Sequence, residues 1–148
     1  MDRALEVAFQ FLIDQHGFVR LPGNGGCSYR TPSLTIEPSF NERDGFETHL
    51  LFPRRGTARV AVGTILSALD ALEPHDVTAQ TTFISLNLDK LADPTAEAYR
   101  DLAALQFWHA PRYRKLWGTS ISLDRASIAS EEARLMRLKQ YFGTQSSS

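Results

Sequence analysis

Apolar residues near the start of the chain recur every three or four positions, at Leu5, Phe9, Leu12 and Ile13. This spacing places them on one face of a helix over residues 2–15. Asp2 is suited to cap the first turn of that helix, and Gly17 is suited to end it. The sequence therefore predicts an amphipathic N-terminal helix.

The pattern then changes to the alternation that is typical of strands. Short strands are predicted in "GFVRL" and "CSYRT", separated by the loop "PGNGG". Residues 33–40 and 46–52 alternate on either side of the turn "NERDG", which predicts an antiparallel hairpin with Pro38 at an edge or a bulge. "TARVAV" predicts either a further strand or an extended lead-in. The side chains expected to face the core from the hairpin are Leu34, Ile36, Phe40, Phe46, Leu50 and Phe52.

Helical spacing returns in the second half of the chain. "VGTILSALDAL" carries apolar residues on one face, and residues 77–91 fit both a helix and a strand, of which we favour the helix. Thr95 can cap a helix that runs through "TAEAYRDLAALQFW", and the last helix is expected over about Leu123 to Phe142. The apolar face of this last helix is formed by Ile128, Leu135, Leu138 and Phe142.

Strands followed by helices predict an α+β fold. We expect an antiparallel sheet of three to four strands, with the N-terminal helix and a C-terminal set of helices packed on one face. Residues 1–142 would form a single domain, and residues 143–148, "GTQSSS", a disordered tail.

Composition supports a globular protein with no strong overall charge. The chain has 148 residues, of which 43% are hydrophobic and 22% charged, and its net charge is −1. Such a balance argues against a dominant electrostatic footprint for nucleic acid. The first helix is periodic in its hydrophobicity, so we expect no membrane span, and the single Cys27 fits a reducing compartment such as the cytoplasm.

No motif in the chain indicates catalysis or metal binding. The loop "LPGNGGCS" lacks the Lys and Ser/Thr of a phosphate-binding loop and opens no helix. Cys27 could act as a nucleophile only beside a base, and the histidines that could serve stand in no catalytic context. They are His16, His49, His75 and His109. Their spacing does not suit a metal either. We therefore expect no enzyme, no cofactor and no metal.

Two segments are candidates for binding a partner. The hairpin carries Glu37, Glu42, Asp44 and Glu47 against one base, Arg43. These acids either discourage pairing between sheet edges or recruit a basic partner.

The other candidate is the aromatic and basic segment 99–117, "YRDLAALQFWHAPRYRKLW". Aromatic residues mixed with arginine are enriched at binding hot spots and also stack on nucleic-acid bases. The candidate binding residues are Trp108, Arg112, Tyr113 and Arg114. Packing of Trp108 or Trp117 in the core is the alternative.

Residues 5–72 resemble a family of small bacterial proteins. The resemblance rests on Gly17 and Phe18 after the first helix, on Tyr29 and Pro32 before the hairpin, and on the strand that holds Glu47. Some members of this family are similar to immunity proteins of polymorphic or contact-dependent toxin systems. The resemblance implies an α+β binding protein without shared catalytic residues.

We therefore expect a non-enzymatic protein-binding domain, such as an immunity protein that blocks the active cleft of a cognate bacterial toxin. Glu37, Glu42, Asp44 and Glu47 would form its acidic rim. The alternative is a small nucleic-acid-binding protein that uses segment 99–117. The sequence does not decide the oligomeric state.

Overall fold

The chain forms five strands and five helices in the computed structural model, which describes residues 3–23, 26–42, 45–56, 58–105 and 125–143. The strands are β1 (Val19–Gly23), β2 (Gly26–Arg30), β3 (Thr35–Asn41), β4 (Gly45–Leu51) and β5 (Arg59–Ala61). The helices are α1 (Arg3–His16), α2 (Val62–Ala68), α3 (Val77–Ala92), α4 (Ala96–Ala104) and α5 (Arg125–Phe142).

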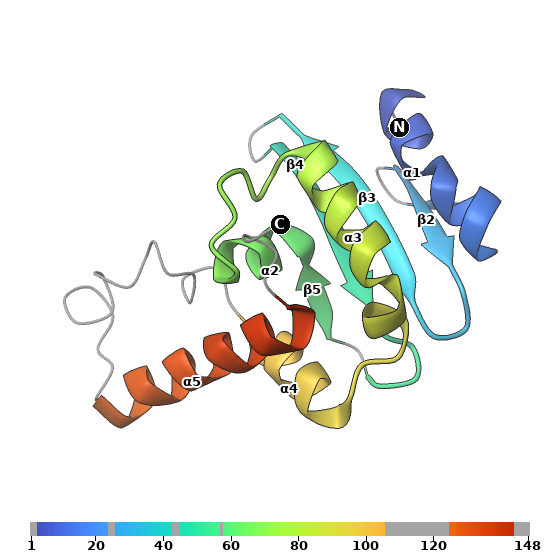
Figure 1. The fold of residues 1–148 in the computed structure, drawn as a ribbon. Coiled ribbons are helices and arrows are strands. Elements are labelled where there is room, and N and C mark those ends of the chain that lie inside the picture. The colour runs from blue at the N-terminus through green and yellow to red at the C-terminus, as the bar shows by residue number, and fades with distance from the viewer. Residues whose placement is uncertain (1–2, 24–25, 43–44, 57, 106–124, 144–148) are drawn as a thin grey trace.

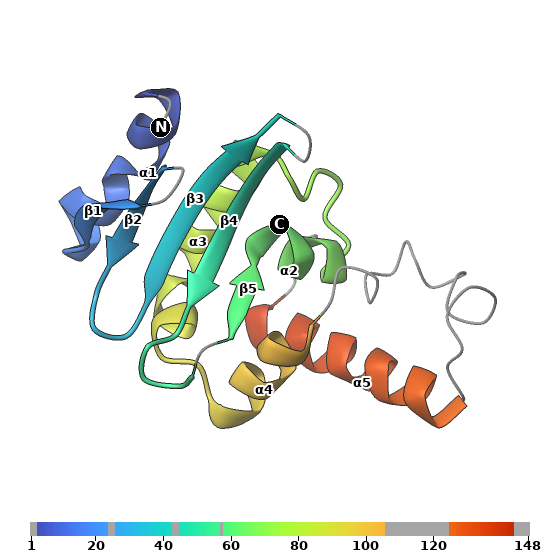
Figure 2. The ribbon, with the colours of Figure 1, turned by 180° about the vertical axis from the view of Figure 1, so that it is seen from behind.

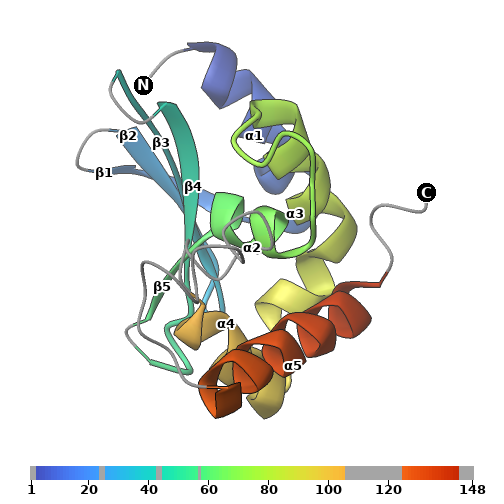
Figure 3. The ribbon, with the colours of Figure 1, turned by 90° about the vertical axis from the view of Figure 1, so that its left-hand side faces the viewer.

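The strands form one antiparallel sheet in the order β1-β2-β3-β4-β5, so each strand pairs with its neighbour in the chain (Figure 1). Seen along the sheet, the described helices lie on one side of it (Figure 3). The predicted α+β architecture is confirmed. The sheet has five strands instead of the expected three to four, because the short β1 and the three-residue β5 both pair with their neighbours. None of the described helices is long and apolar enough to cross a membrane.

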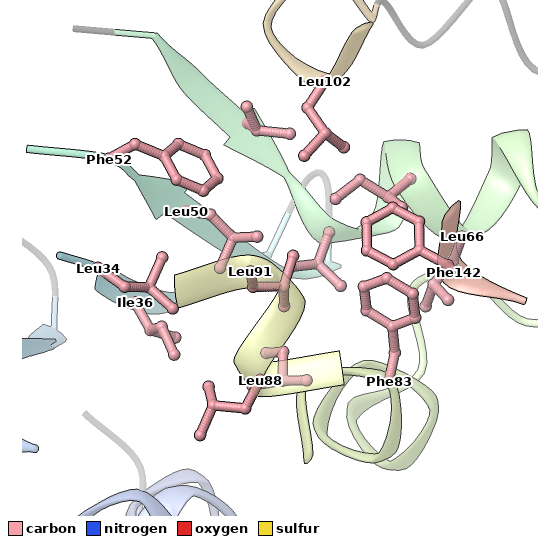
Figure 4. Packing of buried hydrophobic residues seen from close by; sticks show 14 of the residues in the cluster. Leu34, Ile36, Leu50, Phe52, Leu66, Phe83, Leu88, Leu91, Leu102 and Phe142 are labelled. Carbon is pink, nitrogen blue, oxygen red and sulfur yellow. The ribbon is translucent and has the colours of Figure 1, made fainter. Parts of the chain in front are cut away.

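Alternation along the central hairpin decides which side chains enter the core. Phe46, Thr48 and Leu50 of β4 are buried, and the residues between them are partly exposed. Leu34, Ile36, Leu50 and Phe52 meet side chains of α3 and the later helices (Figure 4). Phe40 was expected in this core but is 62% exposed, although its cross-strand partner Phe46 is only 5% exposed. The prediction for Phe40 was wrong, because this residue lies near the end of β3 and the helices do not cover it.

Residues 77–92 are helical, as favoured from the sequence. Ile84, Leu88 and Leu91 are buried, whereas Leu86 is 69% exposed, as the helical spacing requires. The backbone leaves helical geometry at Asn87, whose side-chain amide donates to the carbonyl of Phe83 at 3.0 Å. This break in the helix lies within the stretch whose apolar residues fit both a helical and a strand spacing.

The helix ends follow the predicted signals. Gly17, with a φ of 71°, ends α1, and the Phe18 N–H donates back to the Leu12 carbonyl at 3.1 Å. The Thr95 hydroxyl accepts the Ala98 N–H at the start of α4. Asp2 and Leu123 lie outside the described residues, as do residues 144–148 of the predicted tail.

An ion pair joins the last two helices. Asp101 of α4 is almost fully buried and accepts two N–H groups from the Arg137 guanidinium of α5, at 2.9 and 2.8 Å. Hydrogen bonding to Asp101 raises the pKa of Arg137 above its ordinary value. A two-point contact of this kind fixes orientation as well as distance, so it sets how α5 lies on α4.

Two prolines occupy strand positions where the N–H group that proline lacks would have no hydrogen-bond partner in the sheet. The Thr31 N–H donates to the Leu34 carbonyl, and from this pair the register places the Tyr29 N–H toward β3 and away from β1. Successive residues of an antiparallel strand direct their N–H groups to opposite sides. The nitrogen of Pro22 therefore faces the free side of β1. The nitrogen of Pro38 faces β2, beyond the last paired residue, Ile36.

Candidate functional site

The two ends of the sheet carry opposite charge. One end holds the end of β3, the start of β4 and the loop between α2 and α3, in the upper part of Figure 1 and of Figure 2. We call residues 40–47 and 69–76 the acidic end; residues 43 and 44 lie outside the described part of the chain. These two segments contain six of the 17 acidic residues and only one of the 16 bases. The net charge of −1 therefore conceals a strong local excess of acid.

Glu47 is the structural centre of the acidic end. One of its oxygens, Oε2, accepts the backbone N–H groups of Thr48 and Gly63, each at 2.9 Å, and the side-chain amide of Gln80 at 3.1 Å. The side chain is only 21% exposed. Gly63 stands in the first turn of α2, where a carboxylate is favoured by the unsatisfied N–H groups and the helix dipole. Glu47 thus joins β4 to the start of α2.

Gln80 of α3 completes this network from the inside. It is fully buried, its amide nitrogen also donates to the Pro74 carbonyl at 2.9 Å, and its oxygen accepts the Thr48 N–H at 3.0 Å. The short β5 pairs with β4 only over His49 to Leu51, so the Thr48 N–H lies beyond the end of β5. The glutamine therefore takes the place of a missing strand residue.

The network also explains why residue 63 is a glycine. A β-carbon built on Gly63 would lie 2.5 Å from Oε1 of Glu47 and 2.7 Å from the ring of His75. That imidazole, through Nδ1, is 3.6 Å from Oε1 of Glu47. Only a residue without a side chain lets the carboxylate and the imidazole approach α2 this closely.

The loop between α2 and α3 is held at several points. The Ala71 N–H donates to the Leu66 carbonyl at 2.9 Å, and Asp70 pairs with Lys139 of α5 at 3.0 Å. Asp76 caps α3 by accepting the Ala79 N–H at 3.0 Å. On this anchored loop Leu72 is 98% exposed. The loop therefore presents a large apolar side chain to solvent from a fixed backbone.

The opposite end of the sheet is basic. We call residues 28–35 and 51–59 the basic end; they contain four arginines and no acid, and residue 57 lies outside the described part. A surface hollow of about 640 Å³ lies here and is lined by residues including Arg30, Glu37, Leu51 and Pro53. It therefore combines an apolar wall with one guanidinium and one carboxylate, and the carboxylate is paired with Arg59.

The four arginines of the basic end differ in how they are engaged. Arg59 pairs with Glu37 across the outer face at 3.4 Å, and Arg55 binds the Pro94 carbonyl and lies 3.7 Å from Asp93. Arg30 donates to the Ser28 hydroxyl at 3.3 Å. Arg54 is exposed and has no hydrogen bond or ion pair within the described residues. Arg54 is thus the guanidinium most available to a partner.

The predicted acids have three different surroundings. Glu37 lies next to the basic end, paired with Arg59, whereas Glu42 is exposed in the β3–β4 turn. Glu47 is bound into the network around Gly63. The structure therefore does not bring them together as one row. The remaining candidates, Asp44, Trp108, Arg112, Tyr113 and Arg114, lie outside the described residues, as does Trp117.

Sequence reasoning missed Gln80, Gly63, His75 and Leu72. Gln80 and Glu47 are 33 positions apart in the chain, so no local pattern links them. A signal was available for the loop: "LDALEPHD" adds three acids, which stand on either side of Leu72. Taken with the turn "NERDG", it would have indicated that the two segments share a charge.

Two further titratable groups have shifted pKa values. Burial and the nearby Arg59 lower the pKa of His49, on the outer face of β4, and its Nδ1 is buried without a hydrogen-bond partner among the described residues. Burial, aided by the Cys27 thiol at 3.8 Å, raises the pKa of Tyr29 to about 12. Among the described residues, no group of three or more His, Cys, Asp or Glu side chains could hold a metal.

Comparison with protein-family models, with curated proteins and with solved structures finds no match. Function is therefore inferred from the chemistry and geometry of this chain alone.

Proposed function

We propose that this chain is a non-enzymatic protein-binding domain that recognises a basic partner through its acidic end. The observation that carries the proposal is the excess of acid there, six acids against one base, on a framework held by the Glu47 network. Charge of one sign on a fixed surface speeds association with a partner of opposite sign and sets its orientation.

The acidic end also offers apolar contact. Leu72 and Phe40 are 98% and 62% exposed; Glu73 follows Leu72 directly, and Glu42 lies two positions after Phe40. A few apolar anchors within a polar rim supply most of the affinity of protein interfaces. Because hydrogen bonds hold the loop in place, little conformational entropy is lost when a partner covers Leu72.

A sharper form of the proposal is an immunity protein. Its partner would be a cognate bacterial toxin whose active cleft is basic, and the acidic end would occupy that cleft. The resemblance of residues 5–72 to a family of small bacterial proteins, some of which are similar to immunity proteins, supports this form. Glu42 and Glu73 would then face the toxin, whereas Glu47 would hold the surface in shape.

Nucleic-acid binding by segment 99–117 gains no support from the described part of that segment. Tyr99, a candidate for base stacking, packs edge-on against Phe52 with ring centroids 5.5 Å apart. Asp101 and Leu102 are buried between the helices. Residues 106–117 lie outside the described residues.

The test is calorimetric titration of the protein with the product of the adjacent gene, since an immunity protein is encoded beside its toxin. Glu42→Arg with Glu73→Arg should weaken binding at least about tenfold, because two attractive charges become repulsive. The matched control is Glu132→Arg, an exposed acid on α5. Binding that is equally strong in the double variant and in the control would overturn the role of the acidic end.

A further inference from the structure

The acidic end and the basic end of the sheet carry complementary charge. The segments of the acidic end have a net charge of −5 when their histidine is neutral, and Lys139 offsets one of these acids by pairing with Asp70. The basic end has four arginines, two of which pair with acids outside its segments, Glu37 and Asp93. β3 and β4 run between them, so the charges stand at opposite ends of the same strands. A molecule polarised in this way attracts a second copy of itself in one orientation.

Shape agrees with charge. The basic end has the hollow of about 640 Å³ beside Pro32, Leu51 and Pro53, and the acidic end has Leu72 almost fully exposed on an anchored loop. A leucine is far smaller than this hollow, so it can enter together with parts of its loop. Arg30 lines the hollow and Arg54 follows Pro53, where both can meet acids such as Glu73 that flank the leucine.

We propose that the protein self-associates head to tail, with the acidic end of one copy docked on the basic end of the next. Such a contact is heterologous, because the two surfaces differ, and each added copy leaves one end of each kind free. Association would therefore continue with rising concentration instead of stopping at a dimer. This inference stands apart from the proposed function, although a basic partner bound at the acidic end would compete with it.

Sedimentation velocity of the full chain tests the proposal directly. We expect the mean mass to rise with protein concentration at about 0.02 M salt, and the association to weaken strongly at about 0.5 M salt, where exposed charges are screened within a few ångströms. A monomer at every concentration in low salt would overturn it. Mass that rises equally in both salts would also overturn it.

Two single variants then distinguish a head-to-tail contact from any symmetric one. Arg54→Glu damages the basic end and leaves the acidic end intact, whereas Glu73→Arg does the reverse. Each variant alone should associate at least about tenfold more weakly than the wild type. Mixed together they keep one native contact and gain a charge-swapped contact between the two altered ends, so association should return and grow beyond the 1:1 dimer at which a symmetric contact would stop. A mixture that stays monomeric, or variants that associate like the wild type, would overturn the assignment.

The matched controls use the same changes of charge elsewhere. Arg125→Glu and Glu132→Arg lie at exposed positions of α5 and should associate like the wild type. For the apolar contact, Leu72→Ala should weaken association several-fold, and Leu86→Ala, at an exposed position of α3, should not. Circular dichroism of every variant shows whether it is folded. Equal effects of Leu72→Ala and Leu86→Ala would remove Leu72 from the contact.

Discussion

Glu47 and Glu37 lie on the same hairpin, but the two ends of the sheet use them differently. Glu47 accepts three N–H groups, two of them from the backbone, and is largely shielded from water. Glu37 meets one guanidinium, that of Arg59, on an open face. Hydrogen bonds from fixed backbone groups hold a carboxylate in place, whereas a solvated ion pair gives little energy and little order.

The comparison separates framework from surface. At the acidic end the network of Glu47, Gly63 and Gln80 fixes the position of a loop. Of the acids on that loop, Asp70 pairs with Lys139 and Asp76 caps α3, and the exposed Glu73 remains to meet a partner. At the basic end the arginines reach across loops to carboxylates and a carbonyl. We therefore expect substitutions at the acidic end to affect stability, and those at the basic end to affect mainly charge.

The largest effect should come from Gly63→Ala. Its β-carbon would lie 2.5 Å from Oε1 of Glu47, so the carboxylate must leave its three donors or α2 must shift. We expect a loss of about 3 kcal/mol in the free energy of unfolding, measured by urea denaturation. The counterpart at the basic end is Gly56→Ala, whose β-carbon meets the tip of Tyr99 at 2.9 Å. Gly56→Ala should cost about 1 kcal/mol in the free energy of unfolding. Equal losses in Gly63→Ala and Gly56→Ala would contradict the contrast between the two ends.

Glu47→Ala should come next. It removes the acceptor from two backbone N–H groups and the Gln80 amide, at the start of α2. We expect a loss of about 2 kcal/mol in thermal or urea unfolding. Glu47→Gln keeps one oxygen acceptor and should lose about half as much. A neutral outcome for Glu47→Ala would show that the network does not hold the acidic end together.

Glu37→Ala should have a much smaller effect. In its pair with Arg59, the Arg59 side chain is 58% exposed and that of Glu37 31% exposed, so water still reaches the pair. The expected change is below about 0.5 kcal/mol by the same urea assay. Adding salt should reduce this change further. A loss as large as that of Glu47→Ala would show that the basic end also relies on its carboxylate.

The smallest effect concerns pH. Burial and Arg59 lower the folded-state pKa of His49 below its ordinary 6.5, while Glu47 and Glu37 oppose the shift. As the pH falls, His49 therefore binds a proton in the unfolded chain before it does so in the folded one. The free energy of unfolding falls as the pH drops below about 6.5, and it stops falling once the pH is below the folded-state pKa. His49→Gln should flatten this part of the curve of stability against pH. Parallel curves for the wild type and the variant would argue against it.

Much of the fold could be predicted because its signals are local. The caps at Gly17 and Thr95, the alternation of β4 and the apolar face of α2 each lie within a few residues. Phe40 was misplaced because alternation shows which face a side chain takes and not where the covering helices end. The kink at Asn87 likewise arises from a side-chain hydrogen bond to a carbonyl, which periodicity does not contain.

The candidate site could be predicted only in part. The acidity of the β3–β4 turn is visible in the sequence, but the second acidic segment joins it through contacts between residues far apart in the chain. Glu47 meets His75 directly, and Gln80 links Glu47 to the Pro74 carbonyl. Glutamine is usually a surface residue, but Gln80 is buried because β5 ends before Thr48 and leaves its N–H to be bound by this side chain. Which N–H group lacks a strand partner cannot be inferred before the topology of the sheet is known.

Pro22 has a consequence for how copies of this protein can join. Its nitrogen faces the free side of β1, so an incoming strand finds one donor fewer there. At the other side of the sheet, the Thr48 N–H that β5 does not reach already donates to the Gln80 side chain. Growth by strand addition, the route to cross-β fibrils, is thus discouraged at the free side of β1 and on β4 beyond the end of β5. Copies that meet through the strand ends instead would separate again on dilution or in salt, which keeps the folded monomer recoverable.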